Sequence, residues 1–161
     1  MNAIEIAIKM EKDAIKFYND ASEKSSHLVG KKMFLSIAED EKRHLEMLSQ
    51  IFKEMNVTIK DVNPMNNIKT VFETMKDKMQ EKIEATNDEL DAFKIAMQME
   101  REGIEFYKKV GSEAKSEKER ALFQRLVKEE QQHYDIFLNT YSFLTDTGHW
   151  FMWEEHTIVE G

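Results

Sequence analysis

Residues 40–44 of the chain are Asp-Glu-Lys-Arg-His, and residues 129–133 are Glu-Glu-Gln-Gln-His. Each stretch contains a Glu-x-x-His motif, and the second motif follows the first at an offset of 89 positions (His44 to His133). The same offset, with no gap, aligns Ala3, Ile6, Ala7, Met10, Glu11, Ile15, Phe17, Tyr18 and Phe34 with Ala92, Ile95, Ala96, Met99, Glu100, Ile104, Phe106, Tyr107 and Phe123. The chain therefore contains an internal repeat, and a repeat sets the architecture because both copies fold into the same unit.

Apolar residues recur at steps of three and four along each copy, which is typical of amphipathic helices. The pattern predicts a helix over residues 2–24, a turn at 25–30, a helix to about residue 54, and further helices over 88–112 and 117–144. Between the copies it predicts a loop over 56–67, which contains Pro64, and a shorter helix over 68–85. Asn87 or Asp88 is the expected N-cap of the third long helix.

Each copy is thus a helical hairpin that cannot bury its apolar face alone. Two such hairpins pack into an all-α four-helix bundle, and a long crossover connects the second helix to the third in some bundles of this kind. We expect a single domain over residues 1–161, with hairpins at 2–54 and 88–144, a crossover at 55–87 and a C-terminal tail at 145–161.

The composition excludes several classes of function. The 161 residues carry a net charge of −8, which argues against a nucleic-acid partner because phosphate binding needs a basic surface. The sequence has no cysteine, so disulfides, thiolate metal sites and catalytic thiols are excluded within it. No apolar run approaches the length of a membrane span, and no signal peptide is evident at the N-terminus. We therefore expect a cytoplasmic protein without a membrane partner.

Polar residues occupy positions on the apolar faces of all four predicted long helices. They are Glu11, Glu41, His44, Glu100, Glu130 and His133. At about 1.5 Å of rise per residue, those of one hairpin reach the same height, and the repeat places the others at a matching height. Buried carboxylates are costly unless they are paired, and two divalent cations would balance four of them. A glutamate from each of two helices plus Glu-x-x-His from each of the others is the described pattern of carboxylate di-metal bundles. The sequence predicts a dinuclear metal site.

Two pairs of residues beside these positions have alternative interpretations. Tyr18 and Tyr107 follow Glu11 and Glu100 by seven residues on the same face, so they are core aromatics or phenols that hydrogen-bond a ligand carboxylate. Ala14 and Gly103 are packing residues, or they leave room for a small substrate above the metals.

A third pair directly precedes the motif glutamates. Asp40 and Glu129 are exposed acids, or they reach across the bundle to orient the histidine of the opposing helix, Asp40 to His133 and Glu129 to His44.

The other histidines, the methionines and the tryptophans are assigned simpler roles. His27, His149 and His156 are expected at the surface, and the eleven methionines are expected to fill the core as flexible apolar side chains. The Trp150–Trp153 cluster is expected to cap the bundle or to form an oligomer contact.

These motifs resemble those of the ferritin-like di-iron carboxylate superfamily, and within it the rubrerythrin-like domain. The resemblance spans residues 3 to 144 and rests on Glu11 with Phe17-Tyr18, Glu41-Lys42-Arg43-His44, Glu100 with Phe106-Tyr107, and Glu129-Glu130-Gln131-Gln132-His133. It implies a ferritin-like bundle in which Glu41 and Glu130 bridge two irons and Glu11 and Glu100 are terminal ligands.

The sequence departs from full rubrerythrins at two points. Those proteins carry a cysteine-ligated iron domain, which we do not expect here because the sequence has no cysteine. They also carry an extra glutamate one turn after the ligand of the third helix, where this chain has Gly103. The iron movement and peroxide preference tied to that glutamate are therefore not carried over.

Together these features predict a di-iron redox protein of the peroxidase or ferroxidase type. It would react with hydrogen peroxide or dioxygen, with manganese or zinc as other possible occupants of the site. The alternatives are a ferroxidase for iron storage and a non-catalytic metal-binding or interaction bundle. We also expect an external electron-donor protein and a homo-oligomer.

Overall fold

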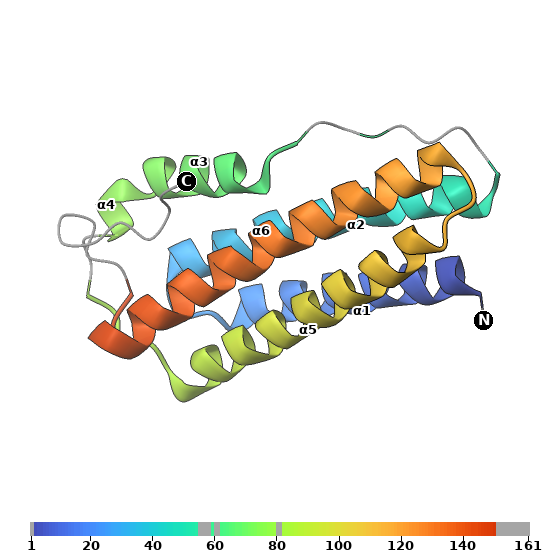
Figure 1. Cartoon of the computed structure of the whole chain (residues 1–161). Coiled ribbons are helices and arrows are strands. Elements are labelled where there is room, and N and C mark those ends of the chain that lie inside the picture. Colours follow the sequence, from blue (N-terminus) through green and yellow to red (C-terminus); the bar gives the residue numbers. More distant parts are fainter. Residues whose placement is uncertain (1, 55–58, 60–61, 80–81, 151–161) are drawn as a thin grey trace.

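The structure of the protein is a computed structural model that describes residues 2–54, 59, 62–79 and 82–150. Within these ranges the chain forms helices α1 (Ala3–Lys24), α2 (Leu28–Phe52), α3 (Pro64–Thr74), α4 (Lys76–Met79), α5 (Asn87–Ser112) and α6 (Glu117–Thr147) (Figure 1). The all-α class and the four long helices predicted from the repeat are confirmed. None of the described helices is long and apolar enough to span a membrane.

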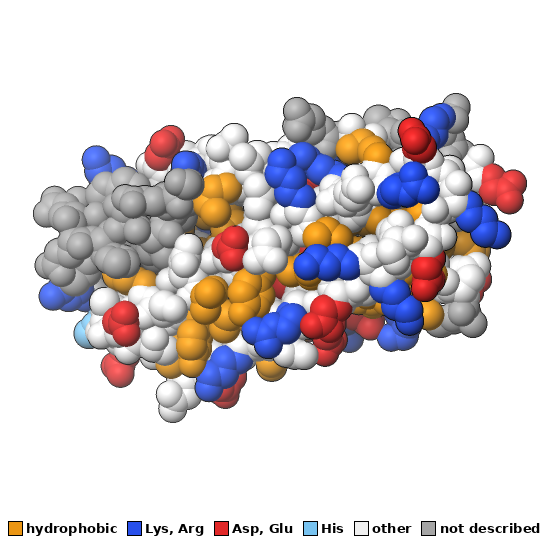
Figure 2. All heavy atoms as spheres, in the orientation of Figure 1, with side chains coloured by type: hydrophobic (Ala, Val, Ile, Leu, Met, Phe, Trp, Pro, Cys, Tyr) orange, Lys and Arg blue, Asp and Glu red, His pale blue; other side chains and the backbone are white. Residues whose placement is uncertain are grey.

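The four long helices form two hairpins, α1 with α2 and α5 with α6, which lie side by side in one bundle (Figure 1). The connection between the hairpins runs back along the bundle, and its helix α3 packs against both α2 and α6. The long crossover predicted for the bundle therefore covers the outer side of the α2–α6 pair. On the face shown in Figure 2, acidic and basic side chains are interspersed, so the net negative charge is not gathered into one patch there.

The crossover helix differs from its prediction. The helix begins at Pro64 instead of residue 68, and the α-helical segments end at Met79 instead of residue 85. Asn63 caps it, because its side chain accepts a hydrogen bond from the Met65 N–H at 3.0 Å. Proline suits the first position of a helix, where no N–H partner is needed, so Pro64 starts the helix and does not belong to a loop.

The start of α5 also differs by one residue from its prediction. Its N-cap is Thr86, and neither Asn87 nor Asp88. The Thr86 hydroxyl accepts from the Glu89 N–H at 3.1 Å, and the Glu89 carboxylate accepts from the Thr86 N–H at 3.0 Å. This reciprocal pair is a capping box, which satisfies two N–H groups that the helix leaves without partners.

One end of the bundle is closed by Trp150, which is fully buried. Its indole N–H donates to Glu89 Oε2 at 2.9 Å, and its ring stacks on His27 at a centroid distance of 5.7 Å. The prediction that His27 lies at the surface is wrong: the ring is 1% exposed and caps α2, with Nδ1 accepting from the Val29 N–H. Trp150 fulfils the capping role predicted for the tryptophan cluster, while Trp153 and His156 lie outside the described residues, and His149 is half-buried.

The core is divided into two apolar clusters along the bundle axis. One contains Tyr18, Phe34, Phe93 and Phe137, and the other contains Tyr107 with Met47, Leu48, Leu122, Phe123 and Leu126. Along α2 and α6 the motif glutamates and histidines fall between the segments that supply these clusters. A polar layer therefore crosses the middle of the bundle, with apolar packing on both sides.

Candidate metal centre

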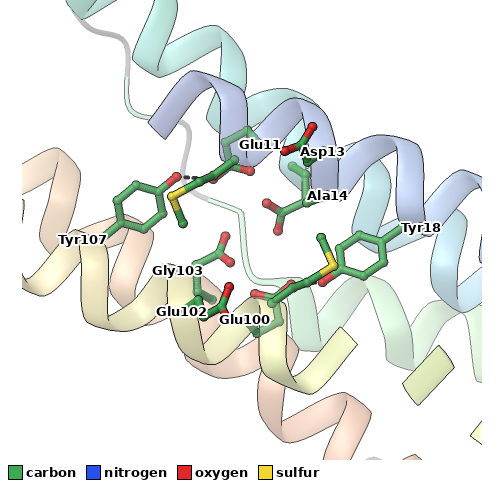
Figure 3. Close-up of a pocket in the computed structure, with 12 residues that line it drawn as sticks. Glu11, Asp13, Ala14, Tyr18, Glu100, Glu102, Gly103 and Tyr107 are labelled. Carbon is green, nitrogen blue, oxygen red and sulfur yellow. Dashed lines mark hydrogen bonds between the residues drawn. The ribbon is translucent and has the colours of Figure 1, made fainter. Parts of the chain in front are cut away.

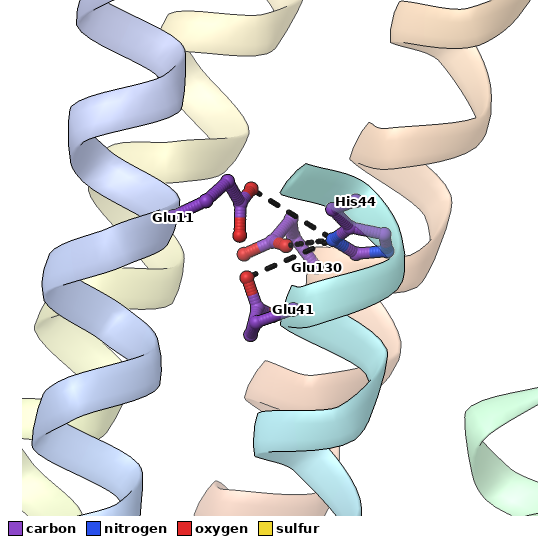
Figure 4. A group of neighbouring side chains, drawn as sticks. All are labelled: Glu11, Glu41, His44 and Glu130. Atoms are coloured by element: carbon purple, nitrogen blue, oxygen red, sulfur yellow. Dashed lines mark ion pairs between the residues drawn. The ribbon is translucent and has the colours of Figure 1, made fainter. Parts of the chain in front are cut away.

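The polar layer brings together six ionisable side chains from all four long helices, each at most 4% exposed. They form two overlapping groups that could each hold a metal ion: Glu11, Glu41, His44 and Glu130, and Glu41, Glu100, Glu130 and His133. Within each group the potential ligand atoms all lie within 4.8 Å of one another. Figure 4 shows the first group, with Glu11 from α1, Glu41 and His44 from α2, and Glu130 from α6. Because Glu41 and Glu130 belong to both groups, the arrangement has the form of a two-ion site with two shared carboxylates.

Each of the six side chains has one buried nitrogen or oxygen atom that makes no hydrogen bond of good geometry among the described residues, although each histidine Nδ1 lies near a glutamate oxygen. These atoms are Glu11 Oε2, Glu41 Oε1, His44 Nδ1, Glu100 Oε2, Glu130 Oε1 and His133 Nδ1. A buried polar atom without a partner costs about 1–3 kcal/mol, so six in one layer need another source of stabilisation. Carboxylate oxygens and imidazole nitrogens without sulfur are the donors that suit iron, manganese or zinc. The residues therefore fit a pair of divalent metal ions.

The two histidines are oriented by carboxylates of the opposing hairpin. Asp40 Oδ2 lies 2.9 Å from His133 Nε2, and Glu129 Oε1 lies 3.0 Å from His44 Nε2. A ring that donates its Nε2–H to a carboxylate keeps the lone pair on Nδ1. That nitrogen faces the layer in both rings: His44 Nδ1 is 3.0 Å from Glu130 Oε1, and His133 Nδ1 is 2.9 Å from Glu41 Oε1. Of the two interpretations weighed for Asp40 and Glu129, the structure shows the buried, histidine-contacting one.

The two tyrosines make the same kind of contact across the bundle. Tyr18 donates its hydroxyl hydrogen to Glu100 Oε1 at 2.6 Å, and Tyr107 donates to Glu11 Oε1. Burial, followed by the negative charge of the nearby glutamates, raises the pKa of both phenols well above the ordinary value. Both tyrosines therefore stay protonated and act as hydrogen-bond donors, while their rings belong to the two apolar clusters.

Two arginines beside the layer were not singled out from the sequence. Arg43 contacts both outer carboxylates, Asp40 at 3.3 Å and Glu129. Arg125 Nε donates to Glu129 Oε2 at 2.7 Å and also donates to the Val62 carbonyl of the crossover. Burial alone would raise the pKa of Glu129, but the hydrogen bonds from His44 and Arg43 outweigh it and hold that pKa well below the ordinary value. Spacing in the sequence could have identified both arginines, because Arg43 follows Asp40 by three residues and Arg125 precedes Glu129 by four, and residues at these spacings share a helix face.

Without metal, the inner glutamates and histidines favour bound protons. Burial, followed by the negative charge of Glu41, raises the pKa of Glu11 to about 8, and burial with the charges of Glu100 and Glu11 raises that of Glu130. Burial alone would lower the pKa values of His44 and His133, but the surrounding carboxylates raise both well above the ordinary value. Metal ions bind deprotonated ligands, so metal binding here must release protons.

A pocket of about 120 Å³ opens onto this layer between α1 and α5 (Figure 3). Ala14 and Gly103 both line it, which supports the interpretation that they leave room beside the glutamates. A Cβ atom at position 103 would lie 3.2 Å from Glu130 Oε2, so the glycine also makes space for that carboxylate. Met10 and Met99 line the same pocket and are half-buried. Met99 also packs against the apolar cluster of Tyr18, as the core-filling prediction expects, whereas Met10 belongs to neither apolar cluster, so that prediction is wrong for Met10.

The comparisons with known proteins give one match. A family model described as Rubrerythrin matches residues 2–141, which include both hairpins up to the last turns of α6. No curated protein and no solved structure matches the chain.

Proposed function

The chain belongs to the rubrerythrin family, and from this premise we propose that its polar layer holds two iron ions and passes two electrons to a small oxidant, hydrogen peroxide or dioxygen. The observation that carries the proposal is the pair of overlapping ligand groups, in which every inner residue has a buried atom without a hydrogen bond of good geometry. By the family resemblance, Glu41 and Glu130 would bridge the ions, and Glu11 with His44 and Glu100 with His133 would complete their ligands.

The chain's own residues set the conditions for the reaction. When bound, a pair of ferrous ions supplies two electrons, one from each ion. Hydrogen peroxide that accepts two electrons and two protons becomes two molecules of water. Tyr18 and Tyr107 hold protons at the edge of the layer, each beside a glutamate that faces the pocket. The pocket volume of about 120 Å³ is sufficient for a molecule of the size of peroxide.

Contacts around the polar layer would hold its histidines in position when the charge of the bound metal ions changes. Asp40 and Glu129 fix the two histidine rings, and Arg43 together with Arg125 offsets the negative charge of these two acids. Apolar clusters pack on both sides of the layer, and the pocket opens onto it between α1 and α5. We further propose that electrons for repeated turnover come from a separate protein, because the sequence contains no cysteine for a second iron site.

Metal analysis with stopped-flow spectroscopy tests this function. Protein purified without oxygen from its native host should carry close to two iron ions per chain, and the reduced form should oxidise rapidly with one equivalent of peroxide. The replacement Glu41→Ala or Glu130→Ala should lose metal most severely, because each residue belongs to both ligand groups. One metal per chain, or sluggish oxidation by both peroxide and dioxygen, would contradict the proposal. Bound zinc without turnover would instead support a metal-binding bundle, and a cage-sized assembly in size-exclusion chromatography would support iron storage.

A further inference from the structure

Met10 and Met99 occupy equivalent positions in the lining of the pocket. Each directly precedes a glutamate of the polar layer, and the repeat offset aligns one with the other. Both line the pocket together with Glu11, Glu100 and the two buried tyrosines, and both are half-buried. Two thioether sulfurs are visible among the lining side chains in Figure 3. A molecule that enters this pocket therefore meets a wall that includes two thioether side chains.

Four other methionines of the chain serve as a comparison for the reactivity of Met10 and Met99. Met33 and Met47 are 2% exposed or less and pack in the core. Met65 and Met97 are half-buried, as Met10 and Met99 are, but they do not line the pocket. All four half-buried thioethers fall in the same range of partial burial, so a preference of several-fold for both Met10 and Met99 points to the pocket that they share.

Thioethers are reductants in their own right. Methionine reacts with hydrogen peroxide by accepting one oxygen atom, which gives methionine sulfoxide and one molecule of water. The sulfur supplies both electrons, so the step needs none from the metal ions. The oxygen–oxygen bond breaks, and the proton released from one peroxide oxygen moves to the other to complete the water. Carboxyl and phenol groups line the same pocket and can carry that proton.

We propose that Met10 and Met99 form a second, sulfur-based site of peroxide reduction in the lining of the pocket, where each thioether is converted to a sulfoxide. The inference rests on the proposed function only in taking peroxide as the oxidant that enters the pocket. Each chain then has two reserve two-electron donors beside the metal pair. They act when oxidant arrives faster than electrons from outside.

Zinc-loaded protein separates this inference from the iron chemistry, because zinc fills the ligands and supplies no electrons. The protein is treated with hydrogen peroxide, and sulfoxide at each methionine is followed by peptide mass spectrometry. Met10 and Met99 should oxidise several times faster than Met65 and Met97, with a mass increase of about 16 Da at each. Equal rates at the four positions would overturn the inference, whatever the iron-loaded protein does.

The reduced, iron-loaded protein then gives the stoichiometry without added reductant. It should consume about three equivalents of peroxide per chain, one at the irons and one at each thioether. The double variant Met10→Leu/Met99→Leu, which keeps similar volume, should consume about one equivalent, while the matched variant Met65→Leu/Met97→Leu should still consume about three. Failure of the irons to oxidise would contradict the proposed function but not the thioether result in the zinc form. Unchanged consumption in Met10→Leu/Met99→Leu would contradict the thioether inference alone.

Discussion

At the scale of single residues, the two outer carboxylates differ in how they are held. Glu129 contacts both Arg43 and Arg125, whereas Asp40 has one contact with Arg43, at 3.3 Å. The repeat offset aligns Arg43 with Gln132 and Arg125 with Ser36, so the arginines break the symmetry of the two copies. The His44 side of the layer is therefore fixed more firmly than the His133 side.

Removal of either outer acid should weaken metal binding. Asp40→Ala and Glu129→Ala should each lower metal affinity by about 10–100-fold, because the facing histidine loses the carboxylate that orients its ring. Competition titration with a chelator measures the change. Glu39→Ala is the matched control, since Glu39 precedes Asp40 on α2 but pairs with Lys42 in solvent. Unchanged affinity in both test variants would mean that the histidines are held by packing alone.

At the scale of elements, the sequence predicts well what depends on periodicity and poorly what depends on distant contacts. The long helices and their polar layer follow from the spacing within each copy and from the offset between copies. His27 was misplaced because its burial depends on Trp150, a residue more than 100 positions away in the chain. Arg125 was missed although Glu129 lies four residues after it on α6, and only its contact with the Val62 carbonyl of the crossover depends on the folded bundle.

Substitutions at the start of α5 test whether Thr86, and not Asn87 or Asp88, is the N-cap of this helix. Thr86→Ala should destabilise the protein by about 1 kcal/mol, because the first turn of α5 loses its side-chain acceptor. Asn87→Ala and Asp88→Ala, at the two positions that the sequence predicted as caps, should have much smaller effects. Chemical denaturation of the three variants measures the difference. Equal losses in all three would show that the capping box contributes no more than its neighbours.

At the scale of the whole molecule, the polar layer makes stability depend on pH and on metal. In metal-free protein the pKa of Glu11 lies at about 8 instead of the ordinary 4.5, so the folded state holds a proton that the unfolded chain releases. This bound proton adds to the free energy of unfolding. The contribution is fully present below about pH 4.5 and is lost as the pH rises through about 8. The raised pKa values of His44 and His133 act in the same direction, because their contribution is also lost at higher pH.

The melting temperature of metal-free protein should therefore fall as the pH is raised from 6 through 8. Metal-loaded protein should be more stable and nearly insensitive to pH over this range, because the cations replace the protons and bind only the folded state. Circular dichroism melts with and without chelator measure both curves. A metal-free protein that becomes more stable over the same pH interval would contradict the assignment of bound protons to the layer.

Removal of buried negative charge should raise the melting temperature of the metal-free protein, whereas chelation of the metal should lower that of the metal-loaded protein. The double variant Glu11→Gln/Glu100→Gln removes two negative charges from the layer, and each new amide oxygen can still accept from a tyrosine hydroxyl. Its metal-free form should melt at a higher temperature than metal-free wild type above pH 8, where Glu11 is otherwise ionised. A lower melting temperature there would mean that buried charge is not the main cost of the metal-free state.

The contacts that complete the layer all join the first hairpin to the second, and this sets an order of events during synthesis. Tyr18 bonds Glu100, Tyr107 bonds Glu11, and each orienting acid reaches the histidine of the other hairpin. The ribosome releases the first hairpin early, with a histidine that has no orienting acid and a glutamate that has no phenol donor. A complete set of metal-ligand candidates therefore forms only after residues 129–133 have emerged and docked. The first hairpin alone therefore offers a newly made chain only half of the polar layer.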